Sequence, residues 1–325
     1  MRKDLVIIRV DGGIASQIDF VALGLEFESR GYKVKYDLSW FDECGNGFYN
    51  EQKGYDRSYN IAFDIPKAFP DIKCEIANRD ENEIYRKKYF VDNEEVIELK
   101  PPLYVGGYLG RHFHFKYRDF FAKHFNPKEI QESDSESKIL LDNILSNHSC
   151  GVHIRRGDLS KEHVVYGKPL SVEYFLKNIQ LVLQIEPKSK FYFFSDDLEW
   201  VKKNVIPSLN SIEYEICNVN SVEKGYLDLY LLSRCKIIIA SHGSMGKYAK
   251  MLALDSKTLL ITLNKNAPME NVMMVNWANS YESFEEKYEE KYEEKQIQKP
   301  LSWRNKIRLK IYTKFRNKLL QKGIL

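Results

Sequence analysis

Short runs of apolar residues alternate with longer amphipathic stretches along most of the chain. The short runs are typical of β-strands buried on both faces, and the stretches between them have the apolar spacing of helices. The expected strands cover residues 5–10, 32–37, 150–156, 190–196, 212–217, 235–241 and 258–263. The expected helices cover residues 16–31, 172–185, 198–206, 225–235 and 245–255. Strands that alternate with helices in this way predict an α/β fold with parallel sheets.

The alternation forms two blocks, one toward each end of the chain, which predicts two Rossmann-like domains facing a cleft. Residues 40–100 are polar and aromatic without a clear period, so we expect loops and short helices there. Polar stretches just before residue 150 mark the boundary between the domains. The predicted units are a first domain over 1–149, a second over 150–280, a charged helical spacer over 281–300 and a basic amphipathic tail over 301–325.

Composition indicates a globular protein made for a reducing compartment. Of the 325 residues, 43% are hydrophobic and 13% aromatic, which excludes a disordered chain. The five cysteines are odd in number and form no CxxC pair, so neither a disulfide framework nor a zinc site is expected. No apolar run has the length of a signal peptide core or of a membrane span. The cytoplasm is the expected location.

The charge is unevenly distributed. The net charge of +3 includes +8 from residues 301–325, which hold no acidic residue, so the other 300 residues sum to −5. A mildly acidic body argues against nucleic-acid binding. Within the tail an apolar residue recurs every fourth position, at Trp303, Ile307, Ile311, Phe315 and Leu319. Such a helix either lies on an anionic membrane surface or packs on the first domain.

The segment CGVHIRRGDLS places Arg155, Arg156 and Asp158 where a buried strand should end. In open parallel sheets, ligands bind at the carboxyl ends of the strands. An arginine fork matches phosphate oxygens and stays charged at any working pH, so it suits a diphosphate leaving group. The alternative is a surface ion pair between an arginine and Asp158.

Further motifs follow in a fixed order. HIRRGD is followed by FYFFSDD and then by DLYLLSRCKIIIASHGS, and DGGIASQID stands near the N-terminus. Together these segments resemble the inverting α-1,2-fucosyltransferases of bacterial polysaccharide biosynthesis, glycosyltransferase family 11, over about residues 5–36 and 150–263. The resemblance implies a GT-B-type fold, with an acceptor-side domain over 1–149 and a domain over 150–280 that binds the nucleotide-sugar donor.

The resemblance also implies roles for single residues. His153 and Asp228 would hold guanine, and Arg155 would hold the β-phosphate of GDP with Arg156 assisting or bracing the loop. The remaining expected donor-binding residues lie at strand ends and turns: Asp196, Asp197, Ser241, Gly243, Ser244, Gly12, Gly13, Ser16 and Gln17. The two aspartates would accept from ribose hydroxyls or brace an arginine. Structural alternatives remain: a core histidine at 153, a helix cap at 197 and a surface helix position at 228.

Two features of the sequence affect the chemistry. Ala15-Ser16 stands where the family pattern has Gly-Asn, and the shorter Ser16 leaves the identity of the donor sugar open. For the catalytic base, Asp158 is the first candidate, with Glu162, His163 and Asp19 behind it. No metal site and no cofactor are expected, because guanidinium groups and a helix N-terminus would neutralise the diphosphate.

We therefore expect an inverting, metal-independent transfer of L-fucose from GDP-β-L-fucose to a sugar hydroxyl, in lipopolysaccharide or other surface polysaccharide biosynthesis. The acceptor would be an oligosaccharide or a lipid-linked glycan, with the tail on the inner face of the cytoplasmic membrane. Alternatives are another GDP-deoxyhexose such as colitose, a retaining two-domain glycosyltransferase, or a non-catalytic protein that binds nucleotide sugars or glycans.

Overall fold

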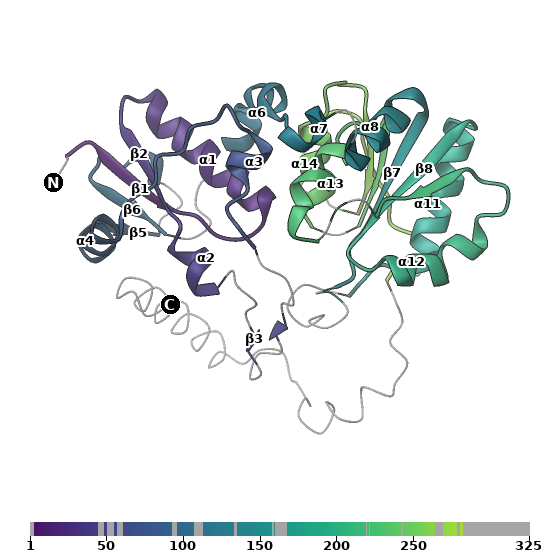
Figure 1. Ribbon diagram of the computed structural model, residues 1–325, viewed down its shortest axis with the longest axis horizontal. Helices are drawn as coiled ribbons and strands as arrows, with labels where there is room; N and C mark the ends of the chain where they lie inside the picture. The colour runs from purple at the N-terminus through teal and green to yellow at the C-terminus, as the bar shows by residue number, and fades with distance from the viewer. Residues whose placement is uncertain are drawn as a thin grey trace.

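The computed structural model of the chain consists of two parallel sheets, each flanked by helices (Figure 1). This arrangement confirms the predicted α/β class. The described residues are 3–44, 49–50, 55–56, 61–92, 96–106, 113–132, 135–157, 159, 168–218, 220, 222–241, 243–263, 269–277 and 280–281. The predictions for Asp158, Glu162 and His163, for most of the spacer and for the whole tail lie outside these residues.

The first sheet has four strands in the order β2-β1-β6-β5, and all neighbours are parallel. Its strands are β1 (Leu5–Arg9), β2 (Lys33–Asp37), β5 (Phe90–Val91) and β6 (Leu103–Val105). The helices of this half are α1 (Ile14–Ser29), α2 (Ser39–Cys44), α3 (Ile65–Ala68) and α4 (Arg79–Tyr89), with a 3-10 turn at Val96–Glu98. A separate antiparallel pair joins β3 (Tyr49–Asn50) to β4 (Tyr55–Asp56).

Helices cover both faces of the first sheet because β1 is buried on both sides. Its even positions, Val6 and Ile8, belong to a core that includes α1, whereas Leu5 and Ile7 pack with Tyr85 of α4. The expectation of loops and short helices over residues 40–100 was wrong for α4, which is 11 residues long. A capping box between Asn78 and Glu81 begins this helix.

The second sheet has six strands in the order β12-β11-β10-β7-β8-β9, again all parallel. Its strands are β7 (His148–Ile154), β8 (Ser189–Ser195), β9 (Tyr214–Ile216), β10 (Ile237–Ala240), β11 (Leu259–Thr262) and β12 (Val272–Met274). The helices of this half are α8 (Glu136–Ser146), α11 (Val172–Ile185), α12 (Leu198–Asn204), α13 (Gly225–Leu232) and α14 (Met245–Met251), with 3-10 turns at Ile206–Ser208 and Val222–Lys224. Residues of α11 and α12 cover one face, and residues of α8, α13 and α14 cover the other.

The strand order of the second sheet contains a topological switch point. The chain runs outward from β7 through β8 to β9 and then returns to place β10 on the other side of β7. The connections that leave the carboxyl ends of β7 and β10 therefore diverge, and ligands of open α/β sheets bind at such a point. The register pairs His153 of β7 with Ala240 of β10, so Arg155 and Ser241 follow at the same edge of the sheet.

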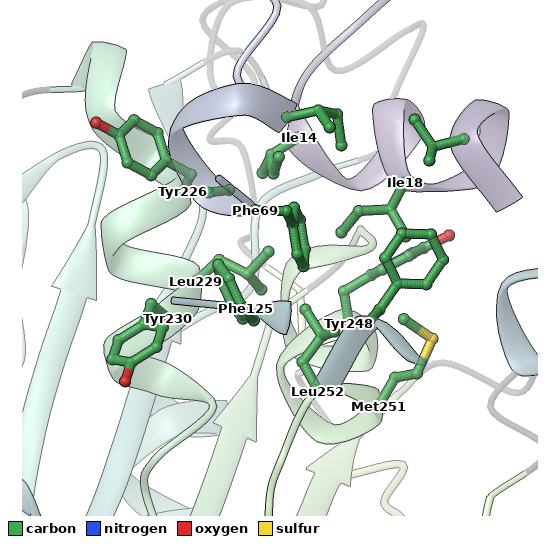
Figure 2. Packing of buried hydrophobic residues seen from close by; sticks show 14 of the residues in the cluster. Ile14, Ile18, Phe69, Phe125, Tyr226, Leu229, Tyr230, Tyr248, Met251 and Leu252 are labelled. Carbon is green, nitrogen blue, oxygen red and sulfur yellow. The ribbon is translucent and has the colours of Figure 1, made fainter. Parts of the chain in front are cut away.

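One hydrophobic core runs through both halves of the molecule. Three short helices connect the halves: α5 (Phe113–Lys116), α6 (Arg118–His124) and α7 (Lys128–Gln131). Figure 2 shows Ile14 and Ile18 of α1, with Phe69 and Phe125, packed against side chains of α13 and α14.

The division into domains stays a prediction, as does the cleft between them. Helix α8 lies ahead of the proposed boundary at residues 149/150 yet packs on β7 and α13 of the second half. Among the helices that the structure describes, none combines the length and the apolar character needed to cross a bilayer.

Candidate active site

His153, Arg155 and Ser241 form a hydrogen-bonded group where β7 and β10 end. Ser241 N–H donates to the His153 carbonyl at 3.0 Å, and the Ser241 hydroxyl accepts from Arg155 N–H at 2.9 Å. The same hydroxyl lies 3.3 Å from Nδ1 of His153. Burial, with a smaller contribution from the Arg155 charge, lowers the pKa of His153 to about 3. At neutral pH the site therefore presents a neutral imidazole beside a guanidinium group.

The Arg155 guanidinium group lies against the backbone of Gly243. Gly243 has φ +95°, and a Cβ atom added there would come within 2.6 Å of Nη1 of Arg155. Glycine suits this backbone conformation, and the Arg155 side chain would have to shift to admit a Cβ atom. Gly243 and Ser244 are exposed, and α14 begins directly after them, as predicted. The structure thus brings Arg155 to the turn that precedes α14.

Asp196 holds the backbone of the loop that follows β7. Its carboxylate accepts from Arg156 N–H at 2.7 Å and from Gly157 N–H at 3.0 Å. A Cβ atom on Gly157 would lie 3.0 Å from Oδ2 of Asp196, so a larger residue would crowd this contact. A carboxylate that accepts two backbone N–H groups fixes the path of the chain. Asp196 thereby sets the backbone just after Arg155.

Arg156 and Asp197 brace the same loop from α12. The Arg156 guanidinium carbon lies 3.9 Å from the centre of the Trp200 ring, and its Nε lies 3.6 Å from Oδ2 of Asp197. The Asp197 side chain accepts from Trp200 N–H at 3.0 Å and caps α12. The helix-cap alternative for Asp197 is therefore observed, and Arg156 makes the contacts of a bracing residue. Trp200 was not expected in the site, although its position three residues after Asp197 suits an N-terminal cap.

Asp228 lies in the first turn of α13 and is partly buried. Its carboxyl group accepts from Nδ2 of Asn220 at 2.8 Å, and Asn220 Oδ1 accepts from Ser137 at 3.0 Å. Burial raises the pKa of Asp228 to about 7, although the Asn220 hydrogen bond acts in the opposite direction. Asp228 can therefore change its charge near neutral pH.

The N-terminal residues of the predicted site lie in the other half, at the turn between β1 and α1. Gly12 has φ +73°, and Gly13 directly precedes α1, while Ser16 lies in its first turn. Gln17 is fully buried, and its amide donates to the Gly12 and Ala62 carbonyls at 3.0 and 2.8 Å. Its oxygen accepts from Asp64 N–H at 2.7 Å. Gln17 therefore ties this turn to a segment about 45 residues further along the chain.

Asp19, named above as a reserve candidate for the catalytic base, contacts two side chains. Its Oδ1 lies 2.6 Å from Nδ1 of His114 and accepts a hydrogen bond from the Tyr248 hydroxyl. Sequence reasoning missed His114 and Tyr248, since the three residues come from α1, α5 and α14. No local pattern marks a contact between residues 229 positions apart.

Among the described residues, no three His, Cys, Asp or Glu side chains are grouped as metal ligands. Asp196 and Asp197, the adjacent carboxylates of the second half, are directed to the loop backbone and to the cap of α12. Metal-independent activity stays a prediction.

Comparison with known sequences identifies relatives of this chain. The pattern of Glycosyl transferase family 11 matches residues 59–281. An Alpha-1,2-colitosyltransferase of Escherichia coli is 26% identical over 265 residues, which are 76% of this chain and 87% of the relative. The O-antigen biosynthesis glycosyltransferase WbnK of Escherichia coli is 25% identical over 141 residues, which are 41% of this chain and 44% of that protein.

Solved structures of similar overall fold are more distant. Heptosyltransferase II of E. coli has a TM-score of 0.44 at 10% identity and covers 84% of this chain and 90% of its own. POFUT1 in complex with GDP-fucose has a TM-score of 0.45 at 11% identity and covers 84% of this chain and 98% of its own.

Proposed function

The chain belongs to glycosyl transferase family 11, and from this premise we propose that it transfers a deoxyhexose from a GDP-sugar to a glycan hydroxyl with inversion. One observation carries the proposal: Arg155 lies at the switch point of a parallel sheet, against the exposed Gly243 that precedes α14. A guanidinium group there can neutralise the diphosphate that leaves the sugar.

His153 and Asp228 have side chains that suit the guanine base of the nucleotide. The ionised Asp228 carboxylate can accept hydrogen bonds from the N–H groups of guanine, and the neutral His153 ring can donate or accept without adding charge. Asp196 and Arg156 act on the loop that carries Arg155. Uracil presents one ring N–H where guanine presents a ring N–H beside an amino group, so Asp228 favours guanine.

The reaction breaks the bond between the anomeric carbon and the diphosphate oxygen, and that oxygen leaves with its electron pair on GDP. A hydroxyl oxygen of the acceptor forms the new bond from the opposite face, which gives the α linkage from a β-linked donor. The hydroxyl proton passes to a base, for which Asp158 remains our candidate. Arg155 offsets the charge that develops on the diphosphate.

L-Fucose is the donor sugar that the family resemblance implies, and colitose is the second candidate. Colitose is L-fucose without the 3-hydroxyl group, and an α-1,2-colitosyltransferase is a relative over 76% of this chain. Ser16 stands where the family pattern has asparagine, and its shorter side chain reaches fewer sugar hydroxyls. A site that does not bind a hydroxyl group discriminates weakly against a sugar that lacks it.

A donor and acceptor screen tests the proposal. GDP-β-L-fucose and GDP-colitose would each be offered with a panel of disaccharides, and NMR would identify the new linkage. We expect an α-1,2 product with at least one donor. Binding of GDP without turnover of either donor would instead support the non-catalytic alternative. We also expect transfer to survive EDTA, and loss of activity that manganese restores would overturn the metal-independent mechanism.

We propose O-antigen or a related surface polysaccharide as the setting, because both curated relatives are bacterial and WbnK is named for O-antigen biosynthesis. The enzyme would then work in the cytoplasm, with residues 301–325 on anionic lipid. Deletion of these residues should abolish sedimentation with anionic vesicles and leave transfer to a soluble acceptor intact. A large fall in melting temperature would instead indicate a packed helix.

A further inference from the structure

A polar cluster is buried inside the apolar contact between the two halves. Asp19 belongs to α1 of the first half, Tyr248 to α14 of the second, and His114 to α5 of the connecting segment. Figure 2 shows Ile18 of α1 beside Tyr248, among the apolar side chains of this contact. The cluster thus joins three separate parts of the chain.

The three side chains meet at one carboxylate oxygen. Oδ1 of Asp19 accepts from the Tyr248 hydroxyl and lies 2.6 Å from Nδ1 of His114. The His114 and Tyr248 rings are 5.1 Å apart between centres, and each residue is 2% exposed. The Asp19 side chain is 12% exposed. Because little solvent reaches these groups, the partners of the Asp19 carboxylate come chiefly from the protein.

A partly buried carboxylate of this kind contributes less to the free energy of folding than apolar side chains would. Removing a carboxylate from water costs free energy that apolar side chains of similar size would not lose. The contact is directional, because Oδ1 of Asp19 meets both the Tyr248 hydroxyl and the His114 ring only when α1, α5 and α14 are correctly placed. The surrounding apolar contact is non-directional, so it specifies the relative placement of the helices less sharply.

The cluster is linked by short steps to both parts of the proposed active site. Tyr248 N–H donates to the Ser244 carbonyl at 2.9 Å, and Ser244 follows the glycine against which Arg155 lies. On the other side, Asp19 lies one turn after Ser16 on α1. A shift of α1 relative to α14 would therefore move the Ser16 turn relative to Arg155.

We propose that Asp19, His114 and Tyr248 are positioning residues that set the placement of the two halves for transfer, and this proposal rests on the function proposed above. Oδ1 of Asp19 accepts from the Tyr248 hydroxyl and His114 is 2% exposed, so we assign these residues to positioning rather than to proton transfer. The cluster keeps donor and acceptor in reacting geometry, and a displacement of 1 Å can cost about 100-fold in rate.

Tyr248→Phe tests the proposal, with Tyr192→Phe as the matched control. Each change removes one hydroxyl, but Tyr192 donates to the Asn143 carbonyl at 2.8 Å within the second half. Tyr248→Phe loses the hydrogen bond to Asp19. Tyr192→Phe loses the bond to Asn143 and a longer one from Nδ2 of Asn147 at 3.3 Å, so its melting temperature should fall at least as far. Only Tyr248→Phe should lower kcat for transfer, by about tenfold or more, with the affinity for GDP unchanged. Asp19→Asn, which keeps the volume, should act like Tyr248→Phe.

A distance measurement tests the same proposal without activity. Nitroxide labels carried by keto amino acids at Lys87 of α4 and Lys203 of α12 would report the separation of the halves and avoid the native cysteines. We expect a broader or shifted distribution in Tyr248→Phe and Asp19→Asn than in Tyr192→Phe. Unchanged distributions, or a kcat equal to that of the control, would overturn the proposal. If the wild-type protein transferred no sugar from any donor, the proposed function would be refuted. The distance distributions between the two labels would still test whether the cluster sets the placement of the halves.

Discussion

The turn after β1 and the turn after β10 both contain a glycine with positive φ, Gly12 at +73° and Gly243 at +95°, but their polar neighbours serve different purposes. In the first turn, the Gln17 amide donates to two carbonyl groups and accepts from one N–H group, all within the first half. In the second turn, an arginine side chain lies on the glycine itself.

The comparison indicates that side chains at the first turn stabilise the fold, whereas the second turn contacts an arginine of the proposed site. The Gln17 side-chain amide forms its hydrogen bonds with backbone groups of the first half. This residue of the DGGIASQID segment therefore stabilises the turn after β1. In the second half, Asp196, Asp197 and Ser241 brace the loops around Arg155. The match to family 11 begins at residue 59, so it includes the second turn and leaves out the first.

The largest expected effect is that of Arg155→Ala. Losing the charged contact to the departing diphosphate should cost about 2–4 kcal/mol in the transition state, with the melting temperature almost unchanged. Arg155→Lys should also be impaired, because an ammonium group cannot replace the two-pronged contact. Steady-state kinetics of both variants measure the effect. Near-normal turnover by either would remove Arg155 from the diphosphate site.

Gln17→Ala should act on stability rather than on the nucleotide. Three hydrogen bonds of about 1 kcal/mol each are lost, so unfolding should become easier by about 2–3 kcal/mol. Thermal unfolding measures the first effect, and calorimetric titration with GDP should give an unchanged affinity. The reverse result, normal melting with weakened donor binding, would make Gln17 a ligand-binding group.

Gly243→Ala and Gly13→Ala form a matched pair. Alanine at 243 must adopt φ +95° and approach Arg155, so we expect a cost of about 1–2 kcal/mol and a clear loss of transfer. Gly13 has φ −78° and no atom within 4 Å of an added Cβ, so melting should not change. Any loss of transfer by Gly13→Ala would then report a ligand at that turn. Wild-type turnover by Gly243→Ala would show that Gly243 does not place Arg155.

The smallest expected effect is a pH dependence that comes from Asp228. Its pKa of about 7 lies above that of an unfolded aspartate, so the stability it contributes is present below about pH 4 and is lost as pH rises to about 7. Ionised Asp228 should bind guanine better, so GDP affinity should rise by up to about tenfold between pH 6 and 8. Asp228→Asn controls for ionisation of the phosphate. Parallel pH profiles for the two proteins would exclude Asp228 from the guanine site.

Sequence pattern predicted the second half well and the first half less well. The helix expected over 172–185 is α11 with the same bounds, because its apolar spacing is regular and Ser171 caps it. In the first half, β6 has only three residues and follows Pro101-Pro102, so it has no recognisable period. In the second half, β12 is equally short and was missed for the same reason. The capping box of α4 was a readable signal that the polar composition of this helix obscured.

For the site, the sequence predicted that Arg155 and Gly243 lie at strand ends and turns. It did not predict the hydrogen bonds that the neighbouring side chains make. Asp196 ends a predicted strand, yet the two backbone N–H groups that donate to its carboxylate lie 39 and 40 residues away. Only the pairing of β7 with β8 brings them together. The contact of Asp19 with Tyr248 depends in the same way on the packing of two helices from opposite halves.

Calorimetric titration with GDP, ADP and UDP in EDTA tests most directly whether the second half is a guanine nucleotide site built on Arg155 and Asp228. We predict that GDP binds at least about tenfold more tightly than ADP or UDP, as expected for one charge-assisted base contact. Asp228→Asn should remove this preference, and Arg155→Ala should weaken all three diphosphates alike. Equal affinity of the wild type for the three nucleotides, or a preference for GDP that survives Asp228→Asn, would contradict the account.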